Sequence, residues 1–204
     1  MAEVTSALVK QLREKTNAGM MDCKRALEEA GADLEQAETL LRQKGIAGAS
    51  KKASRSAKEG VVASYIHLQG KVGVLVEINC ETDFVAKNEI FREFVKDITL
   101  HIAAANPTYV SRDQVPADVI EAEKAIFRVQ VEGKPANIVE KIVDGKIDKF
   151  FSTICLLEQG FIKNPDVTIK DFLNSKISEL GENMLIRRFT RYMVGEELPG
   201  DAAE

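Results

Sequence analysis

The apolar residues of this chain change their spacing near Gly60, and this change constrains the fold more than any other feature. Before it, apolar residues recur every three or four positions, as in helices that bury one face. After it, the runs 61–68 and 72–79 are rich in β-branched and aromatic residues, as in strands. A chain of 204 residues is long enough for one domain or two small ones. The sequence therefore predicts an α+β fold, with a helical N-terminal part before a core that contains a β-sheet.

Three short helices are predicted in the first 45 residues. They cover about 4–15, 20–30 and 33–45, and each carries an apolar stripe. Gly31 suits the left-handed position after the second helix, and Asp33 suits the N-cap of the third. A core of this size is marginal, so we expect region 1–45 to act as a small recognition module.

The segment 46–60 changes to Ala, Ser and Lys, and it has no aliphatic residue after Ile46. This composition predicts a flexible linker. Its positive charges suit either a solvated tether or a phosphate-binding segment, and the tether is favoured. The basic residues are Lys51, Lys52, Arg55 and Lys58.

The core is predicted to span 61–196 and to end in a short tail, 197–204, that frays. The two strand-like runs are separated by Gln69-Gly70-Lys71, a gap that suits a β-hairpin. Alternating residues predict a further strand that joins this antiparallel sheet. The other predicted elements are a helix over 84–105, a helical hairpin over about 116–157, a helix over 171–180 and the strand over 184–194.

Composition excludes several classes of protein. A net charge of -4 and a pI of about 5.5 disfavour general attraction to nucleic acids. No apolar run approaches the roughly 20 residues that cross a bilayer, and the first residues lack a secretory apolar stretch, so a cytoplasmic location is expected. Cys23, Cys80 and Cys155 are odd in number and widely spaced, which predicts reduced thiols and neither disulfides nor a metal site.

Catalytic and cofactor motifs are also missing from the sequence. The two histidines, His67 and His101, are expected to be surface or packing residues. Gly70-Lys71 lacks the first glycine of a phosphate loop and is followed by valine, so direct nucleotide binding is not expected. Isolated glycines at 45 and 48 do not make a dinucleotide fingerprint. We therefore expect no cofactor and no enzymatic activity.

Met20 and Met21 open the second predicted helix. Adjacent helical residues point about 100° apart, so both cannot be buried on one narrow face. Methionine adapts well to protein-contact surfaces. The pair therefore suits either contact with a partner or packing onto the linker.

The stretch from Thr82 to Asn88 lies where a predicted strand meets a predicted helix. Thr82 can cap that helix, and Asp83 can oppose the positive end of its dipole. Phe84 suits either folding back into the core, which its spacing favours, or standing at a corner that a partner could receive.

Three motifs together resemble the elongation factor Ts family, the nucleotide exchange factors of elongation factor Tu. Asn17 stands where the family usually has glycine, and the chain is similar to short members with one core subdomain. The motifs are Leu12-Arg13-Glu14-Lys15-Thr16-Asn17-Ala18-Gly19-Met20-Met21-Asp22-Cys23-Lys24-Arg25-Ala26-Leu27, Glu77-Ile78-Asn79-Cys80-Glu81 running into Thr82 to Asn88, and Gly181-Glu182-Asn183-Met184-Leu185-Ile186-Arg187-Arg188.

This resemblance implies a ubiquitin-associated-like bundle, a linker and a core that docks on the guanine-nucleotide domain of Tu. It implies that the core disturbs the Mg²⁺ and phosphate site of Tu so that GDP leaves, without any covalent step. The residues implied for this contact are Thr82, Asp83, Phe84, Val85, Ala86, Lys87 and Asn88. A second contact from the bundle is implied for Arg13, Met20, Met21 and Lys24. A homodimer is compatible with this interpretation.

The competing hypothesis is a nucleic-acid-binding translation protein, against which the acidic net charge weighs. A small hydrolase is the third and least favoured hypothesis, because the chain has only two histidines and no catalytic motif. The basic residues of the competing hypothesis are Lys51, Lys52, Arg55, Lys58, Arg187, Arg188 and Arg191.

Overall fold

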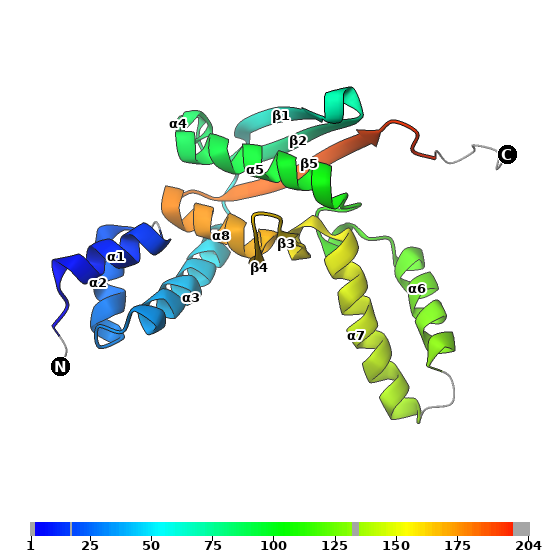
Figure 1. Cartoon of the computed structure of the whole chain (residues 1–204), viewed down its shortest axis with the longest axis horizontal. Coiled ribbons are helices and arrows are strands. Elements are labelled where there is room, and N and C mark those ends of the chain that lie inside the picture. The colour runs from blue at the N-terminus through cyan, green and yellow to red at the C-terminus, as the bar shows by residue number, and fades with distance from the viewer. Residues whose placement is uncertain (1–2, 17, 132–134, 198–204) are drawn as a thin grey trace. The chain divides into compact units, whose positions relative to one another are not determined.

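The computed structural model describes residues 3–16, 18–131 and 135–197. Asn17, the turn at Gly133 and nearly all of the predicted frayed tail lie outside these residues. The chain divides into two compact units, Met1–Val61 with Ile78–Phe94 and Asp171–Leu185, and Val62–Glu77 with Val95–Lys170 and Ile186–Glu204. Helices and strands both contribute, which confirms the α+β class (Figure 1).

The first unit begins with three helices, as predicted: α1 (Ser6–Thr16), α2 (Met20–Glu29) and α3 (Leu34–Lys52). The Asp33 carboxylate accepts the Gln36 N–H at 2.8 Å and caps α3. Gly31 has a φ of 60°, the left-handed conformation expected after α2. The bundle encloses a small apolar core made of Leu12, Cys23, Ala26, Leu27 and Ala37.

The predicted end of the third helix at Gly45 is wrong, because α3 continues to Lys52. Gly45 faces the helix α8 (Ile169–Leu180), where a Cβ atom added to the glycine would meet the side chain of Ser178 at an ordinary contact distance of 3.8 Å. Ala49, one turn further along, is buried. Tertiary packing therefore outweighs the roughly 1 kcal/mol by which glycine disfavours a helix. The flexibility of the remaining linker stays a prediction.

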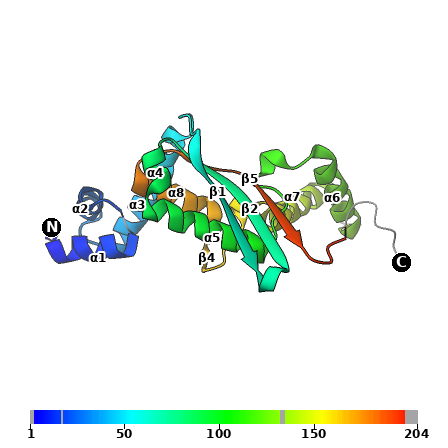
Figure 2. The same ribbon diagram turned by 90° about the horizontal axis from the view of Figure 1, so that it is seen from above.

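Three strands form one sheet in the order β1 (Glu59–His67), β2 (Val72–Cys80), β5 (Met184–Met193) (Figure 2). The predicted hairpin and the further strand that joins it are both present, and the strand order comes from the structure. A short 3-10 turn, Leu68–Gly70, joins β1 and β2. Alternate residues of β2 are buried, as expected for a sheet with one covered face.

The helix predicted over 84–105 is in fact two helices, α4 (Asp83–Lys87) and α5 (Glu89–Ala105). Asn88 separates them, because its backbone is extended with a ψ of 140°. The Asn88 side-chain oxygen accepts the Ile90 N–H at 2.8 Å, so this residue satisfies a free N–H group at the start of α5. A helical interpretation based on apolar spacing could not detect this break.

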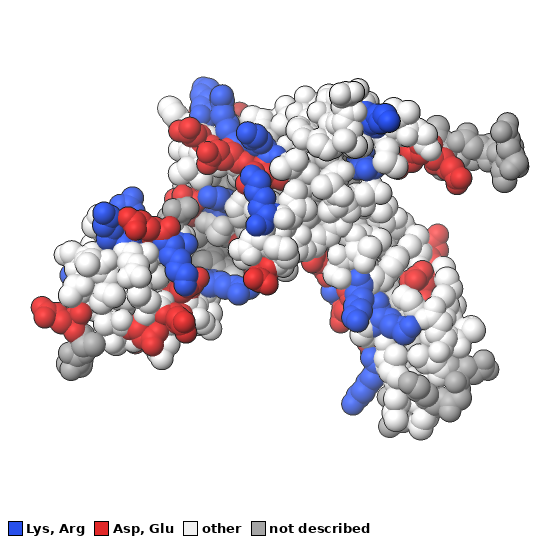
Figure 3. Space-filling model, in the orientation of Figure 1, with Lys and Arg blue, Asp and Glu red and all other residues white. Residues whose placement is uncertain are grey.

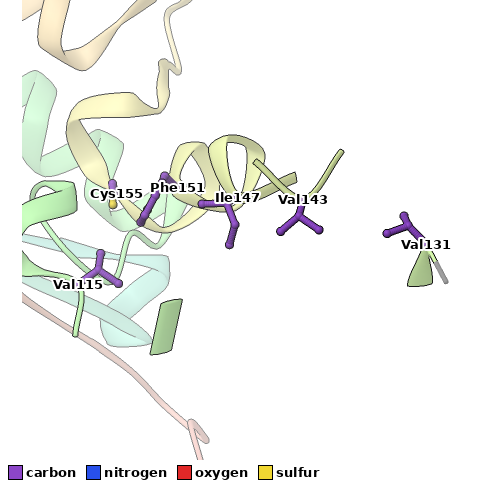
Figure 4. Close-up of a cluster of buried hydrophobic side chains, with 6 residues drawn as sticks. All are labelled: Val115, Val131, Val143, Ile147, Phe151 and Cys155. Carbon is purple, nitrogen blue, oxygen red and sulfur yellow. The ribbon is translucent and has the colours of Figure 1, made fainter. Parts of the chain in front are cut away.

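The second unit contains the predicted helical hairpin, α6 (Ala117–Gln130) and α7 (Ala136–Ile154). Val143, Ile147 and Phe151 recur every four residues on α7 and form the hairpin core with Val131, Val115 and Cys155 (Figure 4). Two short strands, β3 (Gly160–Phe161) and β4 (Asn164–Thr168), form an antiparallel pair that the sequence analysis missed. Among the described residues, every helix is too short or too polar to cross a membrane.

Candidate partner-binding site

The corner between β2 and α5 contains the five-residue helix α4. Thr82 precedes it in an extended conformation, and its hydroxyl oxygen accepts the Val85 N–H at 3.4 Å, which confirms the predicted cap. The Cys80 thiol donates to the Thr82 carbonyl at 3.1 Å. Ala86 is buried and anchors the helix on its inner side. The corner is therefore fixed at both its entry and its inner face.

Phe84 is 81% exposed, so the core alternative for this residue is wrong. The break at Asn88 explains the difference. Because α4 and α5 are separate helices, Phe84 does not continue the buried stripe of α5 that contains Phe91 and Phe94. A large aromatic side chain consequently stands in solvent at the start of α4.

Asp83 and Lys87 form an exposed ion pair across one turn of α4, with 2.6 Å between the carboxylate and the ammonium. The hydrogen bond from Lys87 lowers the pKa of Asp83. Asp83 also lies in the first helical turn, where a negative charge opposes the helix dipole. The corner therefore presents a phenylalanine beside a carboxylate that is ionised at neutral pH.

The turn between α8 and β5 holds this corner through contacts that the sequence analysis did not anticipate. Glu182 accepts the Thr82 N–H at 3.0 Å and the Thr82 hydroxyl at 2.7 Å. In the opposite direction, Glu81 accepts the Asn183 N–H at 2.6 Å. The Asn183 side chain donates to the Arg55 carbonyl at 2.8 Å. The motifs 77–88 and 181–188 are thus joined by crossed hydrogen bonds. No local sequence pattern reveals this relation.

A second apolar surface lies at the start of α2. Met20 is 58% exposed and Met21 is 62% exposed, so the structure packs neither of them away. Arg13 and Lys24 are exposed as well. Gly19 at the N-cap provides no side-chain hydrogen bond to this helix. The residues implied for a bundle contact are therefore accessible from solvent.

Most of the arginines in the competing nucleic-acid hypothesis have partners within the chain. Arg187 and Arg188 bind Glu77 at 3.1 and 2.7 Å, and Arg191 donates to the Ala103 carbonyl at 3.3 Å. Acidic and basic side chains are interspersed over the N-terminal helices and over α4 (Figure 3). On the face shown, the described charges of these helices therefore form no single-sign patch of the kind that favours binding to a phosphate backbone.

His101, Cys80 and Cys155 are buried titratable side chains. His101 is buried, binds Gln159 at 2.9 Å and accepts the Ile162 N–H, so it is a packing residue whose pKa is lowered by burial. Burial raises the pKa of both Cys80 and Cys155 to about 11, so both thiols are protonated at neutral pH. Within the described ranges, no cluster of His, Cys, Asp and Glu is suited to a metal ion.

Comparison with known proteins identifies relatives over most of the chain. A family model described as "Elongation factor TS" matches residues 46–196. A protein named elongation factor Ts from Carboxydothermus hydrogenoformans is 62% identical over 197 residues, covering 96% of this chain and 91% of the relative. Proteins of the same name from Citrifermentans bemidjiense and Thermodesulfovibrio yellowstonii are 61% and 55% identical, covering 96% and 95% of this chain and 91% and 97% of the relatives.

Proposed function

The chain belongs to the elongation factor Ts family, and from this premise we propose that it binds elongation factor Tu in the cytoplasm and promotes the release of GDP from it. The protein makes and breaks no covalent bond in this role. It acts by binding one conformation of Tu more tightly than another.

The observation that carries the proposal is the exposed Phe84 on a corner that the rest of the unit holds in place. Burying a side chain of this size contributes roughly 1.5–3 kcal/mol, which the free chain does not obtain. The proposed docking places Phe84 and Asp83 against the nucleotide domain of Tu, where they disturb the groups that hold Mg²⁺ and the phosphates. Neighbouring residues of α4, from Thr82 to Asn88, complete this surface.

The exposed methionines of α2 support a second contact. Met20 and Met21 form an adaptable apolar surface, and Arg13 and Lys24 place positive charges on the same bundle. In the proposed complex this surface contributes affinity, whereas the α4 corner weakens GDP binding. The two contacts therefore have separable kinetic effects.

Reciprocity of binding free energies explains how nucleotide in turn weakens the binding of the factor to Tu. A factor that weakens GDP binding to Tu is itself bound more weakly, by the same ratio, when GDP is present. A 1,000-fold effect corresponds to a coupling free energy of about 4 kcal/mol. One phenylalanine does not supply this alone, so Asp83 and the neighbouring residues of α4 must contribute to the coupling as well.

Release of a fluorescent GDP from purified Tu tests the proposal. The chain is expected to raise the release rate in a saturable way and to form a salt-tolerant 1:1 complex with Tu. The matched calorimetric titration, with GTP and this chain alone, is expected to give no saturable heat. A release rate that stays at the spontaneous value at all concentrations of the chain would contradict the proposed function, and steeply salt-dependent RNA binding would favour the competing hypothesis.

A further inference from the structure

Glu182 binds both hydrogen-bond donors of Thr82, a residue 100 positions away. Its carboxylate oxygens accept the backbone N–H and the hydroxyl of Thr82 at 3.0 and 2.7 Å. The side chain is half-buried, and within the described residues it has no Lys or Arg partner at ion-pair distance. Its charge is therefore directed to Thr82.

This contact decides how Thr82 uses its hydroxyl group. A carboxylate only accepts hydrogen bonds, so the Thr82 hydroxyl hydrogen points to Glu182. A lone pair of the same oxygen is then available to accept the Val85 N–H. Glu182 thus fixes both the rotamer and the donor direction of the residue that caps α4.

Helix α4 depends on this cap more than a longer helix would. It has five residues, and isolated helices of that length are unstable in water. Phe84 lies in its first turn and is 81% exposed, so contacts of its own ring do little to fix its position. The direction in which Phe84 points is set by the backbone that Thr82 and Glu182 hold.

A second hydrogen bond fixes Glu182 itself. Glu81, next to Thr82, accepts the Asn183 N–H at 2.6 Å, and Arg55 lies 3.5 Å from the same Glu81 carboxylate oxygen. Gly181 has a φ of 78°, a conformation that favours glycine and turns the chain from α8 towards β5. The two crossed carboxylate contacts hold the α8–β5 turn and the α4 corner in one arrangement.

We propose that Glu182 is a positioning residue for nucleotide exchange, because its carboxylate holds Thr82 and thereby presents Phe84 to the partner in a preorganised direction. The inference rests on the proposed exchange function. Glu182 acts through Thr82 and Phe84 and does not itself need to touch the partner.

The decisive experiment is a double-mutant cycle between Glu182→Ala and Phe84→Ala, with GDP release from Tu as the readout. Glu182→Ala is expected to lower the maximal release rate about tenfold, the effect of losing hydrogen bonds to a charged group, and to change the half-saturating concentration less than about twofold. In the Phe84→Ala background the same substitution is expected to cause no further loss. Glu182→Gln, which keeps one acceptor oxygen, is expected to fall between the parent and Glu182→Ala.

A matched control comes from Glu158, which binds Arg112 in the second unit and has a similarly sheltered carboxylate. Glu158→Gln is expected to leave exchange unchanged. Full maximal release by a folded Glu182→Ala variant would overturn the proposal. So would a loss that adds in full to that of Phe84→Ala, because it would indicate a general structural effect.

Amide hydrogen exchange at Val85 and Ala86 tests the same inference without Tu. Both amides donate within the corner, to the hydroxyl and the carbonyl of Thr82. Glu182→Ala is expected to speed their exchange about tenfold relative to the parent, and Glu158→Gln is expected to leave it unchanged. Unchanged protection would overturn the positioning role. A parent chain that fails to accelerate GDP release from Tu would overturn the exchange function, and the amide measurement would still decide whether Glu182 holds the corner.

Discussion

Helices α2 and α4 both begin with exposed apolar residues, but their first turns are held differently. Gly19 gives α2 no side-chain cap, and the exposed residues there are flexible methionines. Thr82 caps α4, Glu182 holds Thr82, and the exposed residue is a rigid phenylalanine. A flexible surface adapts to a partner and provides affinity, whereas a preorganised one can impose a shape on it. This difference supports the proposal that the bundle provides affinity for Tu and that the α4 corner weakens GDP binding.

The largest expected effect on GDP release comes from replacing the exposed phenylalanine, Phe84. Phe84→Ala is expected to leave the free energy of unfolding within about 0.5 kcal/mol, since the ring is exposed. The same variant is expected to lower the maximal GDP release rate about 10- to 100-fold, the range that corresponds to 1.5–3 kcal/mol. Thermal unfolding and stopped-flow release on the same sample measure both quantities.

Phe94→Ala is the matched control, because Phe94 is fully buried and its ring packs against that of Phe172 in a tilted arrangement, with 5.1 Å between the ring centroids. It is expected to cost about 3–5 kcal/mol of stability. Asp83→Ala tests the neighbouring carboxylate and is expected to reduce release without unfolding the chain. If the Phe84→Ala, Asp83→Ala double variant remains folded and fully active, the assigned role of the corner is wrong.

The bundle is expected to show the opposite kinetic pattern. Replacing both Met20 and Met21 by alanine should raise the half-saturating concentration of the chain by roughly 3- to 30-fold, because it removes apolar area from the contact. The maximal rate of GDP release should stay the same. A titration of release rate against chain concentration distinguishes the two parameters. A fall in the maximal rate with an unchanged half-saturating concentration would contradict the proposal that α2 provides affinity and only α4 weakens GDP binding.

The segment between α3 and β1 connects the bundle to the strand that follows, and protease cleavage tests where this connection lies. Limited trypsin digestion is expected to cut first between Lys51 and Lys58, and within that stretch at Arg55 or Lys58, which lie beyond the end of α3. Asn183→Ala removes the hydrogen bond to the Arg55 carbonyl. The cleavage rate should then rise about 2- to 10-fold, the factor for a loss of 0.5–1.5 kcal/mol. A first cut within α5 would place the boundary elsewhere.

The smallest expected effect concerns the charge on the corner. Lys87 lowers the pKa of Asp83 below the ordinary 3.8, so Lys87→Met is expected to raise it, as carboxyl resonances in an NMR titration would report. A lowered folded-state pKa means that the stabilisation is present above pH 3.8 and is lost as the pH falls through the lowered value. Glu121, whose pKa Lys124 lowers, serves as the internal reference and should titrate as before. An unchanged pKa of Asp83 would mean that the ion pair is absent in solution.

Local sequence signals predicted many of the elements that the structure contains. The helix period before Gly60 and the strand-like runs after it gave the bundle, the β1–β2 hairpin and the third strand. Asp33 and Thr82 were predicted as caps, and both make the expected hydrogen bond. These features depend on residues within a few positions of one another, so their patterns are visible in the sequence.

Three features could not be predicted in the same way. Helix α3 continues past Gly45 to Lys52, where Ala49 is buried and Gly45 faces α8, a helix far away in the sequence. Asn88 ends α4 although the apolar spacing continues around it. The strands β3 and β4 have two and five residues, too few for a clear alternation. In the first two cases a tertiary or single-residue effect outweighed the local pattern, and in the third no periodic pattern was present.

The sequence by itself determined the α+β class, the bundle, the sheet, the helical hairpin and the motif that contains Thr82, Asp83 and Phe84. It did not decide whether Phe84 is buried or exposed, because the spacing of apolar residues indicates the face of a helix and not whether anything covers that face. Only the tertiary structure decided that the ring is exposed and that Glu182 holds the residue before it. The exposure follows from the break at Asn88, which apolar spacing does not report. The hold on Thr82 arises from a contact between segments 100 positions apart, and the free energy of such a contact has no counterpart in a local pattern.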